Sequence, residues 1–287
     1  MFILATASLS FAPRAPHLPR LQTCARRFEA PPAALAPSGV DGLPLAVQAG
    51  FLGATFVTLG SAAHVIDRAY GAVRRPDGVL WDVWEIGAAL LLGLIFVTAG
   101  RSHFTVPEAF TAIYPPQGTW GLWYLPGSAE FHVAWTGVAE IGGGSGLLTG
   151  AILDATRLLS QTQQASDPAS AQLSIEAEVG RGETRVALEP KPRALISNPC
   201  RLRPVAARAL FVLVLCVTPA NFFMFSHGAT MPGVVEGPLP MQWHLVRFLA
   251  QVSVLSVLLT LSELQGLTAG RSDDDNAAES GVPSAPR

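Results

Sequence analysis

The stretch GAALLLGLIFVTAG, residues 87–100, contains no charged side chain and presents no polar face when it is wound into a helix. A helix of a soluble bundle keeps one polar face toward water. A helix that is apolar all round suits lipid, where about 20 residues cross the hydrocarbon core. The stretch therefore predicts a transmembrane helix over 83–104.

Windows of similar length and character recur along the chain. Five spans are predicted, at 45–66, 83–104, 128–150, 205–225 and 242–264. The composition agrees, because only 14% of the 287 residues are charged, against about 25% in soluble domains. The third window is the least apolar, since it is rich in Gly, and Gly in a bilayer helix marks close packing against a neighbour. We expect an all-α, multi-pass transmembrane helical bundle.

Lysine and arginine occur in alternate segments between the predicted spans. They are found in 67–82, in 151–204 and in the C-terminal tail, whereas 105–127 and 226–241 contain none. With five spans, the positive segments share one face, which the positive-inside rule assigns to the cytosol or stroma, together with the C-terminus. Aromatic residues are expected at the lipid–water interface of the other face: Tyr114, Trp120, Trp123, Tyr124 and Trp243.

The N-terminal segment 1–40 has the composition of an organelle address. It is rich in Arg, Ala, Pro and Ser, and Glu29 is its only acidic residue, as is typical of transit peptides. Its opening MFILATASLS, followed by Phe11, resembles the bipartite presequences of secondary plastids. We expect plastid targeting, with another organelle, secretion or no targeting as alternatives.

The other boundaries follow from composition. Residues 151–204 form a long polar insertion and 267–287 a polar tail, and we expect both to be disordered. The predicted transmembrane helices therefore occupy 41–150 and 205–266. A formal net charge of −2 argues against nucleic acid as a partner. Membrane lipid and the proteins of a membrane complex are the expected partners.

Ionisable and amide side chains gather at predicted helix ends on the face that lacks Lys and Arg. Such groups are costly in a membrane, and each is a functional candidate by default. His244, Arg247 and Gln251 follow one stripe of their helix, because they are spaced i, i+3 and i+7. The full set of candidate ligand-binding residues is Arg101, His103, Glu130, His132, Glu140, Asn221, His227, His244, Arg247 and Gln251.

Two of the helices carry features that orient these candidates. Glu140 shares a stripe with Gly137 and Gly144, so we expect it to face a neighbouring helix rather than lipid. Pro219 lacks a backbone donor, and we expect it to kink the fourth helix and turn Asn221 toward the bundle.

Each candidate also has a purely structural interpretation. A histidine at a helix end can bond water or a lipid headgroup, and Arg101 or Arg247 could form an ion pair with Glu130 or Glu140. Imidazoles suit a metal or haem, but the histidines have no ligand spacing, so no metal site is predicted. Quinone reduction or proton transfer is the other chemistry that protonatable groups at one membrane face can support.

From the second predicted helix onward, the chain resembles the DoxX-like family of small integral membrane proteins. The matching stretches are FVTAGRSHFTVPEAF (96–110), TGVAEIGGGSGLL (136–148), VTPANFFMFSHG (217–228) and PLPMQWHLVRFLAQ (238–251). The resemblance implies a four-helix core, with 45–66 as one extra N-terminal helix, and a link to membrane redox systems such as a thiosulfate:quinone oxidoreductase subunit. The residues at matching positions are Gly100, His103, Phe104, Pro107, Glu140, Pro219, Ala220 and Asn221.

These observations predict a plastid membrane protein that is a subunit of, or accessory to, a quinone-linked redox complex. Glu140 would be a buried proton acceptor or anchor, and the histidines would shape a pocket for a quinone-like ligand, with haem as the other cofactor considered. A structural assembly protein and a small-solute carrier are the alternatives. The carrier is disfavoured because the helix halves toward the Lys/Arg-rich face are expected to hold almost no polar residues. An independent enzyme is least expected, since the chain has no nucleophile elbow, P-loop or dinucleotide fingerprint.

Overall fold

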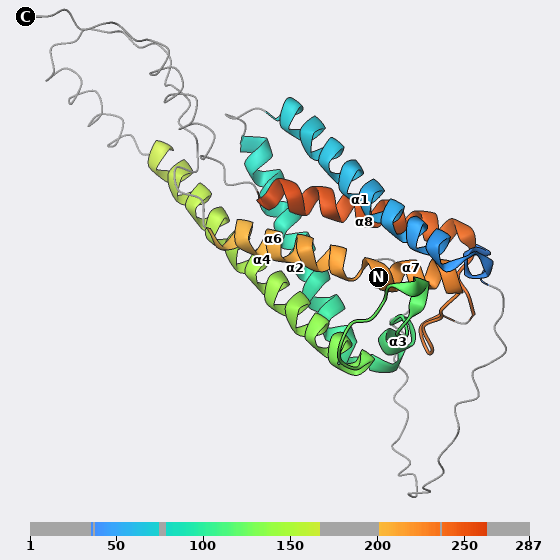
Figure 1. Cartoon of the computed structure of the whole chain (residues 1–287). Coiled ribbons are helices and arrows are strands. Elements are labelled where there is room, and N and C mark those ends of the chain that lie inside the picture. The colour runs from blue at the N-terminus through green and yellow to red at the C-terminus, as the bar shows by residue number, and fades with distance from the viewer. Residues whose placement is uncertain (1–35, 37, 75–78, 167–200, 236, 263–287) are drawn as a thin grey trace, which may run out of the picture. The chain divides into compact units, whose positions relative to one another are not determined.

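A computed structural model describes residues 36, 38–74, 79–166, 201–235 and 237–262, and all the regular structure in them is helical. Figure 1 shows the order of the elements along the chain. The helices are α1 (Leu45–Val73), α2 (Val79–Thr105), α3 (Pro107–Ala112), α4 (Ala129–Ser166), α6 (Leu202–Cys216), α7 (Thr218–His227) and α8 (Met241–Ser262), with 3₁₀ turns at Val40–Gly42 and Thr119–Gly121.

Each predicted span is helical, with 205–225 divided between α6 and α7, and several helices are longer than predicted. α1 continues past Asp67 to Val73, and α4 continues past Asp154 to Ser166. The prediction of a disordered insertion from residue 151 is therefore wrong for 151–166, and 167–200 lie outside the described residues. Residues 1–35 and 37 of the predicted address segment 1–40, and the predicted tail 267–287, lie outside them too. The charged residues in these two extensions include Asp67, which accepts a hydrogen bond from Thr260 at 2.9 Å, and Asp154, which pairs with Arg203.

Four helical segments are long and apolar enough to cross a membrane, which makes the chain a multi-pass membrane protein by length and composition. They are α1, α2, the α6–α7 pair (Leu202–His227) and α8. α4 is long as well but is not among these four, because its glycines and Glu140 lower its hydropathy. The all-helical prediction is confirmed, and a fifth crossing by α4 stays a prediction.

The predicted break at Pro219 is present. α6 ends at Cys216, and α7 begins at Thr218 with Pro219 in its first turn. Proline fits the first turn of a helix because the backbone N–H groups there have no partner within the helix. The chain therefore changes from one helix to the next at Val217, and α7 presents its own face to the residues around it.

The described chain divides into two compact units, and each is built from helix halves. The first unit comprises Met1–Gly60, Ala99–Val138 and Val214–Ser253, and the second comprises Ser61–Thr98, Ala139–Leu213 and Val254–Arg287. Among the described residues, the first unit contains Arg101 and Arg247 as its only arginines, without lysine, and the remaining arginines belong to the second. This distribution agrees with the predicted alternation of positive segments.

The core of the first unit is aromatic. Trp120 is 1% exposed and packs with Leu52 and Phe222. Its indole nitrogen donates to Ser226 Oγ at 3.2 Å. Trp120 was expected at the lipid–water interface, and that expectation is wrong, because the loop containing it folds inward and buries the indole; Trp243, at 43% exposed, is free to lie there.

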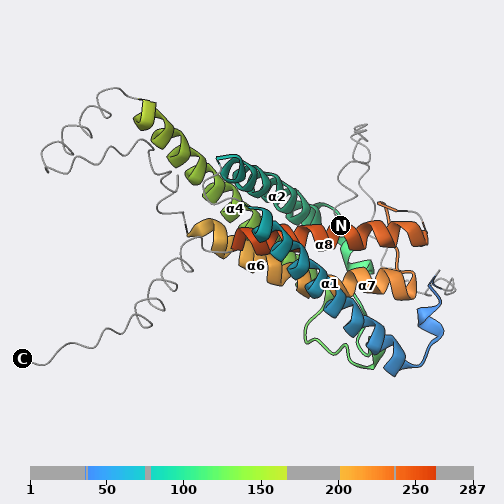
Figure 2. The same cartoon turned by 90° about the horizontal axis from the view of Figure 1, so that it is seen from above.

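The second unit packs α4 tightly against α2 and α6. A Cβ on Gly144 would lie 2.8 Å from the carbonyl oxygen of Gly93, and one on Gly150 would lie within 2.9 Å of the backbone of Arg203. Figures 1 and 2 both show α4 alongside these two helices. The prediction that these glycines permit close helix packing is confirmed, since backbone can approach backbone only where a side chain is missing.

Candidate functional site

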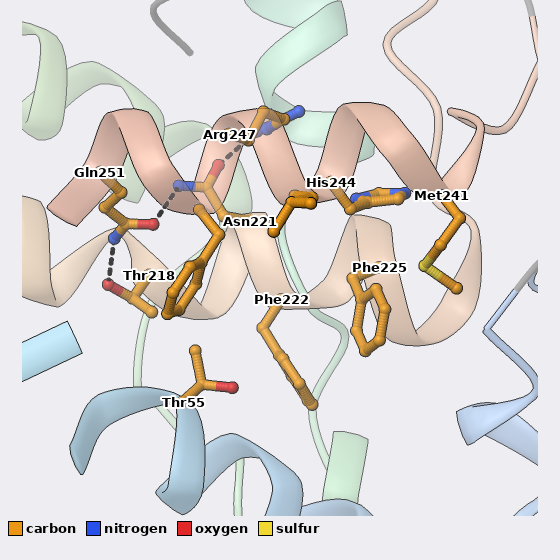
Figure 3. A pocket seen from close by; sticks show the side chains of 11 residues that line it. Thr55, Thr218, Asn221, Phe222, Phe225, Met241, His244, Arg247 and Gln251 are labelled. Atoms are coloured by element: carbon orange, nitrogen blue, oxygen red, sulfur yellow. Dashed lines mark hydrogen bonds between the residues drawn. The ribbon is translucent and has the colours of Figure 1, made fainter. Parts of the chain in front are cut away.

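The first unit contains a cavity of about 310 Å³ between α1, α7 and α8 (Figure 3). Eleven residues line it: Thr55, Thr218, Asn221, Phe222, Phe225, Met241, His244, Leu245, Arg247, Phe248 and Gln251. Four of these belong to the predicted set, namely Asn221, His244, Arg247 and Gln251. The sequence therefore located part of a real cavity, and the predicted stripe of α8 is the part that faces it.

A chain of hydrogen bonds forms the polar side of the cavity (Figure 3). Arg247 Nη2 donates to Asn221 Oδ1, and Asn221 Nδ2 donates to Gln251 Oε1 at 3.4 Å. Gln251 Nε2 donates in turn to Thr218 Oγ1 at 2.6 Å, and the Thr218 hydroxyl donates to the carbonyl of Val214 at 3.0 Å. Each acceptor in the chain thus receives a donor, and the direction of the bonds runs from Arg247 into the break between α6 and α7.

The break at Pro219 is what brings Asn221 into this chain. Gln251 Nε2 also donates to the Val214 carbonyl at 3.4 Å, close to the end of α6. The last carbonyl groups of a helix accept no hydrogen bond from within that helix, so side chains can donate to them. The prediction that Pro219 turns Asn221 toward neighbouring helices agrees with the position of Asn221 beside α8.

The opposite wall of the cavity is apolar. Phe222 and Phe225 extend from α7, and Figure 3 shows them on the side of α1, below the polar chain. His244 meets Phe225 edge-on, with ring centroids 5.6 Å apart. Leu245 and Met241 are 59% and 47% exposed, so the cavity reaches the outer surface of α8, which is the lipid-facing surface of a spanning helix.

Arg247 is the only lysine or arginine in the cavity lining, and it carries a permanent positive charge on the polar side. Its Nη1 donates to Met224 Sδ at 2.9 Å and its Nη2 to Asn221, both of which are neutral. Within the described part of the chain Arg247 makes no ion pair. The possible ion pair of Arg247 with Glu130 is not formed, because Glu130 is exposed and the guanidinium of Arg247 bonds groups of α7.

The other three candidate histidines lie elsewhere in the first unit, each against a ring of its own. The stacked or tilted pairs are His103 with Phe110 at 4.0 Å, His132 with Tyr114 at 5.1 Å and His227 with Phe223 at 4.9 Å. Over the described ranges, no three His, Cys, Asp or Glu side chains come together as metal ligands. Of the four histidines that were expected to shape one pocket, only His244 lines the cavity.

The remaining acidic and basic candidates also lie outside the cavity lining. Glu140 belongs to the second unit and is 2% exposed, which confirms that it faces protein rather than lipid. Arg101 and Glu130 are exposed. Glu140 is thus a buried residue of the second unit, and the cavity of the first unit is formed without it.

The second unit contains an ion cluster that the sequence analysis missed. Arg203 Nη1 lies 3.2 Å from Glu85 Oε2, and Arg203 Nε lies 2.9 Å from Asp154 Oδ2. All three side chains are at most 5% exposed. Arg74 adds a second contact to Glu85 at 3.1 Å, and Tyr70 donates to the same carboxylate at 3.3 Å.

A signal for this cluster was present in the sequence. Glu85 lies inside the second predicted span, where an unpaired carboxylate would be costly. A basic partner for Glu85 could therefore have been predicted. The expectation that the helices toward the Lys/Arg-rich face hold almost no polar residues is therefore wrong. Asp154 and Arg203 were assigned to a loop, and they are helical residues whose charges are paired. A solute carrier was disfavoured only because these helix halves were expected to lack polar residues, so that objection no longer holds.

Comparison with known proteins adds no relative. No protein-family model, no curated protein and no solved structure matches the chain.

Proposed function

We propose that the protein is a plastid membrane protein of the DoxX-like type that serves a quinone-linked redox complex, and that the cavity between α1, α7 and α8 binds a quinone-like ligand. The cavity is the observation that carries this proposal. The basic, acid-poor N-terminal segment supports the plastid location. The four stretches that resemble DoxX-like proteins support the redox setting.

The two walls of the cavity match the two chemical parts of a quinone ring. Phe222, Phe225 and Phe248 offer apolar and aromatic surface to the faces of a planar ring. Arg247 offers N–H donors to a carbonyl oxygen, which a quinone provides. The volume of about 310 Å³ is at the lower end of the range for small-molecule pockets, roughly 300–1,000 Å³, and suits one headgroup ring.

A route from the bilayer also fits this ligand. Leu245 and Met241 line the cavity and are exposed on α8. A lipid-soluble molecule can therefore reach the cavity sideways, and its tail can remain along the exposed apolar surface of the helix.

The test is a titration of the protein, purified into nanodiscs of zwitterionic lipid, with a short-tailed quinone. We expect saturable binding that weakens about three- to tenfold in Asn221→Leu and in Thr218→Val, since each removes a member of the hydrogen-bond chain worth about 0.5–1.5 kcal/mol. His132→Phe is the matched control, because His132 stacks on Tyr114 away from the cavity. Non-saturable partitioning that is equal in all variants would contradict the proposal.

The same preparation separates the alternatives. An assembly protein predicts no saturable binding and unchanged complex yield in the cavity variants. A solute carrier predicts uptake into proteoliposomes that depends on residues of the cavity. Neither result is expected if the cavity holds a quinone-like ring as a bound ligand.

A further inference from the structure

We infer that the cavity selects an ionised oxygen acid on an apolar body, such as a ring with an acidic hydroxyl group or a fatty carboxylate, over the neutral compound of the same shape. This inference rests on the cavity of the proposed function and specifies the chemical class of its ligand. It follows from the charge balance and the hydrogen-bond direction around Arg247.

The charge balance around the cavity is positive. A guanidinium stays ionised in proteins, and Arg247 lies on a helix that is apolar enough to cross a membrane. The lining contains no carboxylate, and His244 is its only other titratable side chain. Of the acidic residues described in the first unit, Glu108 and Glu130 are exposed, and Asp41 accepts a hydrogen bond from the backbone of Ala36.

Arg247 is partly buried. A charge on a membrane-spanning helix is costly when it has no counter-charge, and an anionic ligand lowers that cost. The neutral partners of Arg247, Asn221 and Met224, satisfy two of its five N–H groups without balancing its charge. A bound oxyanion would supply both the acceptor and the missing negative charge. Charge-assisted hydrogen bonds are about twice as strong as neutral ones.

The direction of the hydrogen-bond chain leaves donors rather than acceptors for a ligand. The side-chain oxygens of Asn221, Gln251 and Thr218 each already accept a hydrogen bond from within the chain. A ligand that needs to donate, such as an alcohol or an un-ionised acid, would have to share an oxygen that already accepts one hydrogen bond. A ligand that only accepts finds the guanidinium of Arg247.

His244 gives the same wall a second polar contact. Its Nε2 is buried and has no hydrogen-bond partner among the residues that the structure describes. The ring belongs to the cavity lining, one helical turn before Arg247. His244 therefore adds a polar ring beside Arg247, and Arg247 remains the charged donor of this wall.

Two matched pairs of probes test the inference on the full protein in nanodiscs. The first pair is 1,4-naphthoquinone and 2-hydroxy-1,4-naphthoquinone, which is ionised at neutral pH. The second is decanol and decanoate. We expect the ionised member of each pair to bind at least tenfold more tightly, corresponding to about 1.4 kcal/mol. If the ionised probe is preferred in just one of the two pairs, that pair identifies whether the natural ligand is a ring acid or a fatty acid.

Three variants separate the charge of Arg247 from its other roles. Arg247→Gln should abolish the preference for the ionised probes, and Arg247→Lys should keep it. Arg101→Gln is the matched control, because Arg101 is the other arginine described in the first unit and is exposed. If Arg247→Gln does not fold, the preference of the unaltered protein and of Arg247→Lys still decides.

The outcomes distinguish the inference from the function that it rests on. Equal binding of both members of both pairs by the unaltered protein, or a preference that survives in Arg247→Gln, overturns the inference. Saturable binding of neutral naphthoquinone in that case leaves the proposed function standing. Binding of decanoate, with neither naphthoquinone bound, supports the inference and overturns the quinone proposal.

Discussion

Arg203 Nε lies 2.9 Å from Asp154 Oδ2, and the Asp154 side chain is 0% exposed. The pair joins the first turn of α6 to α4, and the other end of the guanidinium contacts Glu85 of α2. One arginine therefore binds carboxylates from two different helices. Removing one member of such a buried pair leaves the other charge without its partner. We therefore expect a substitution here to lower the stability strongly.

The first prediction concerns this ion cluster. Asp154→Asn should destabilise the protein by about 3–5 kcal/mol, the range found when one member of a buried ion pair is removed. Thermal unfolding in detergent measures the change. Arg157→Gln is the control, because Arg157 lies 3.7 Å from the same Asp154 carboxylate but is 44% exposed, and exposed pairs contribute about 0–1 kcal/mol. Equal losses in the two variants would show that burial does not decide the strength of these pairs.

The second prediction concerns the glycines of α4. Gly144→Ala should cost about 1–3 kcal/mol, as overpacking does, because its Cβ would lie 2.8 Å from the Gly93 carbonyl oxygen and 2.9 Å from the Val97 nitrogen. Both contacts are backbone atoms, which cannot rotate away. Gly142→Ala, two residues earlier, meets nothing within 4 Å and should be neutral or slightly stabilising, since Ala favours a helix by about 1 kcal/mol over Gly. A stable Gly144→Ala protein would refute the close approach of α4 to α2.

The third prediction concerns the indole of Trp120. Trp120→Ala should cost about 3–5 kcal/mol, because it removes a large side chain from a packed core. Trp243→Ala, at 43% exposed, should change the unfolding temperature much less. Trp120→Phe keeps most of the volume but loses the hydrogen bond to Ser226, and an intermediate loss is expected. A larger loss of stability in Trp243→Ala than in Trp120→Ala would mean that Trp120 is not buried in the core.

The fourth prediction decides whether α4 crosses the membrane. Single cysteines at Gln117, before α4, and at Arg201, after it, should react with an impermeant thiol reagent from opposite sides of sealed vesicles. The distribution of arginines between the loops supports this outcome through the positive-inside rule. Labelling of both positions from one side would mean that α4 does not cross and that the chain has four spans. The native Cys24, Cys200 and Cys216 are replaced by Ser in this experiment.

The helices were predictable where the signal is local. The window 83–104 is apolar all round, and a helix, α2, occupies Val79–Thr105. The stripe of His244, Arg247 and Gln251 was predictable for the same reason, because helical periodicity places the three on one face. Pro219 likewise predicted the break between α6 and α7, because proline lacks the backbone N–H that a continuous helix needs.

Contacts between distant segments were not predictable in this way. Nothing near Asp154 in sequence shows that Arg203 will neutralise it, and both were read as loop residues for that reason. Trp120 was read as an interfacial residue, because an aromatic ring near a predicted span is typical of that position. The burial of Trp120 depends on Phe222 and Ser226, which come from a helix more than a hundred residues later.

The sequence by itself determined that this chain is helical and multi-pass, and it identified most of the polar side of the cavity on α8. Hydrophobicity and helical periodicity are properties of neighbouring residues, so they can be read from the chain directly. Only the tertiary structure decided which of the ten candidate residues meet. It placed Arg247 with the neutral Asn221 and Met224, and it gave Glu85 and Asp154 to Arg203. Charge pairing depends on distance in space, and that distance is set by how the helices pack.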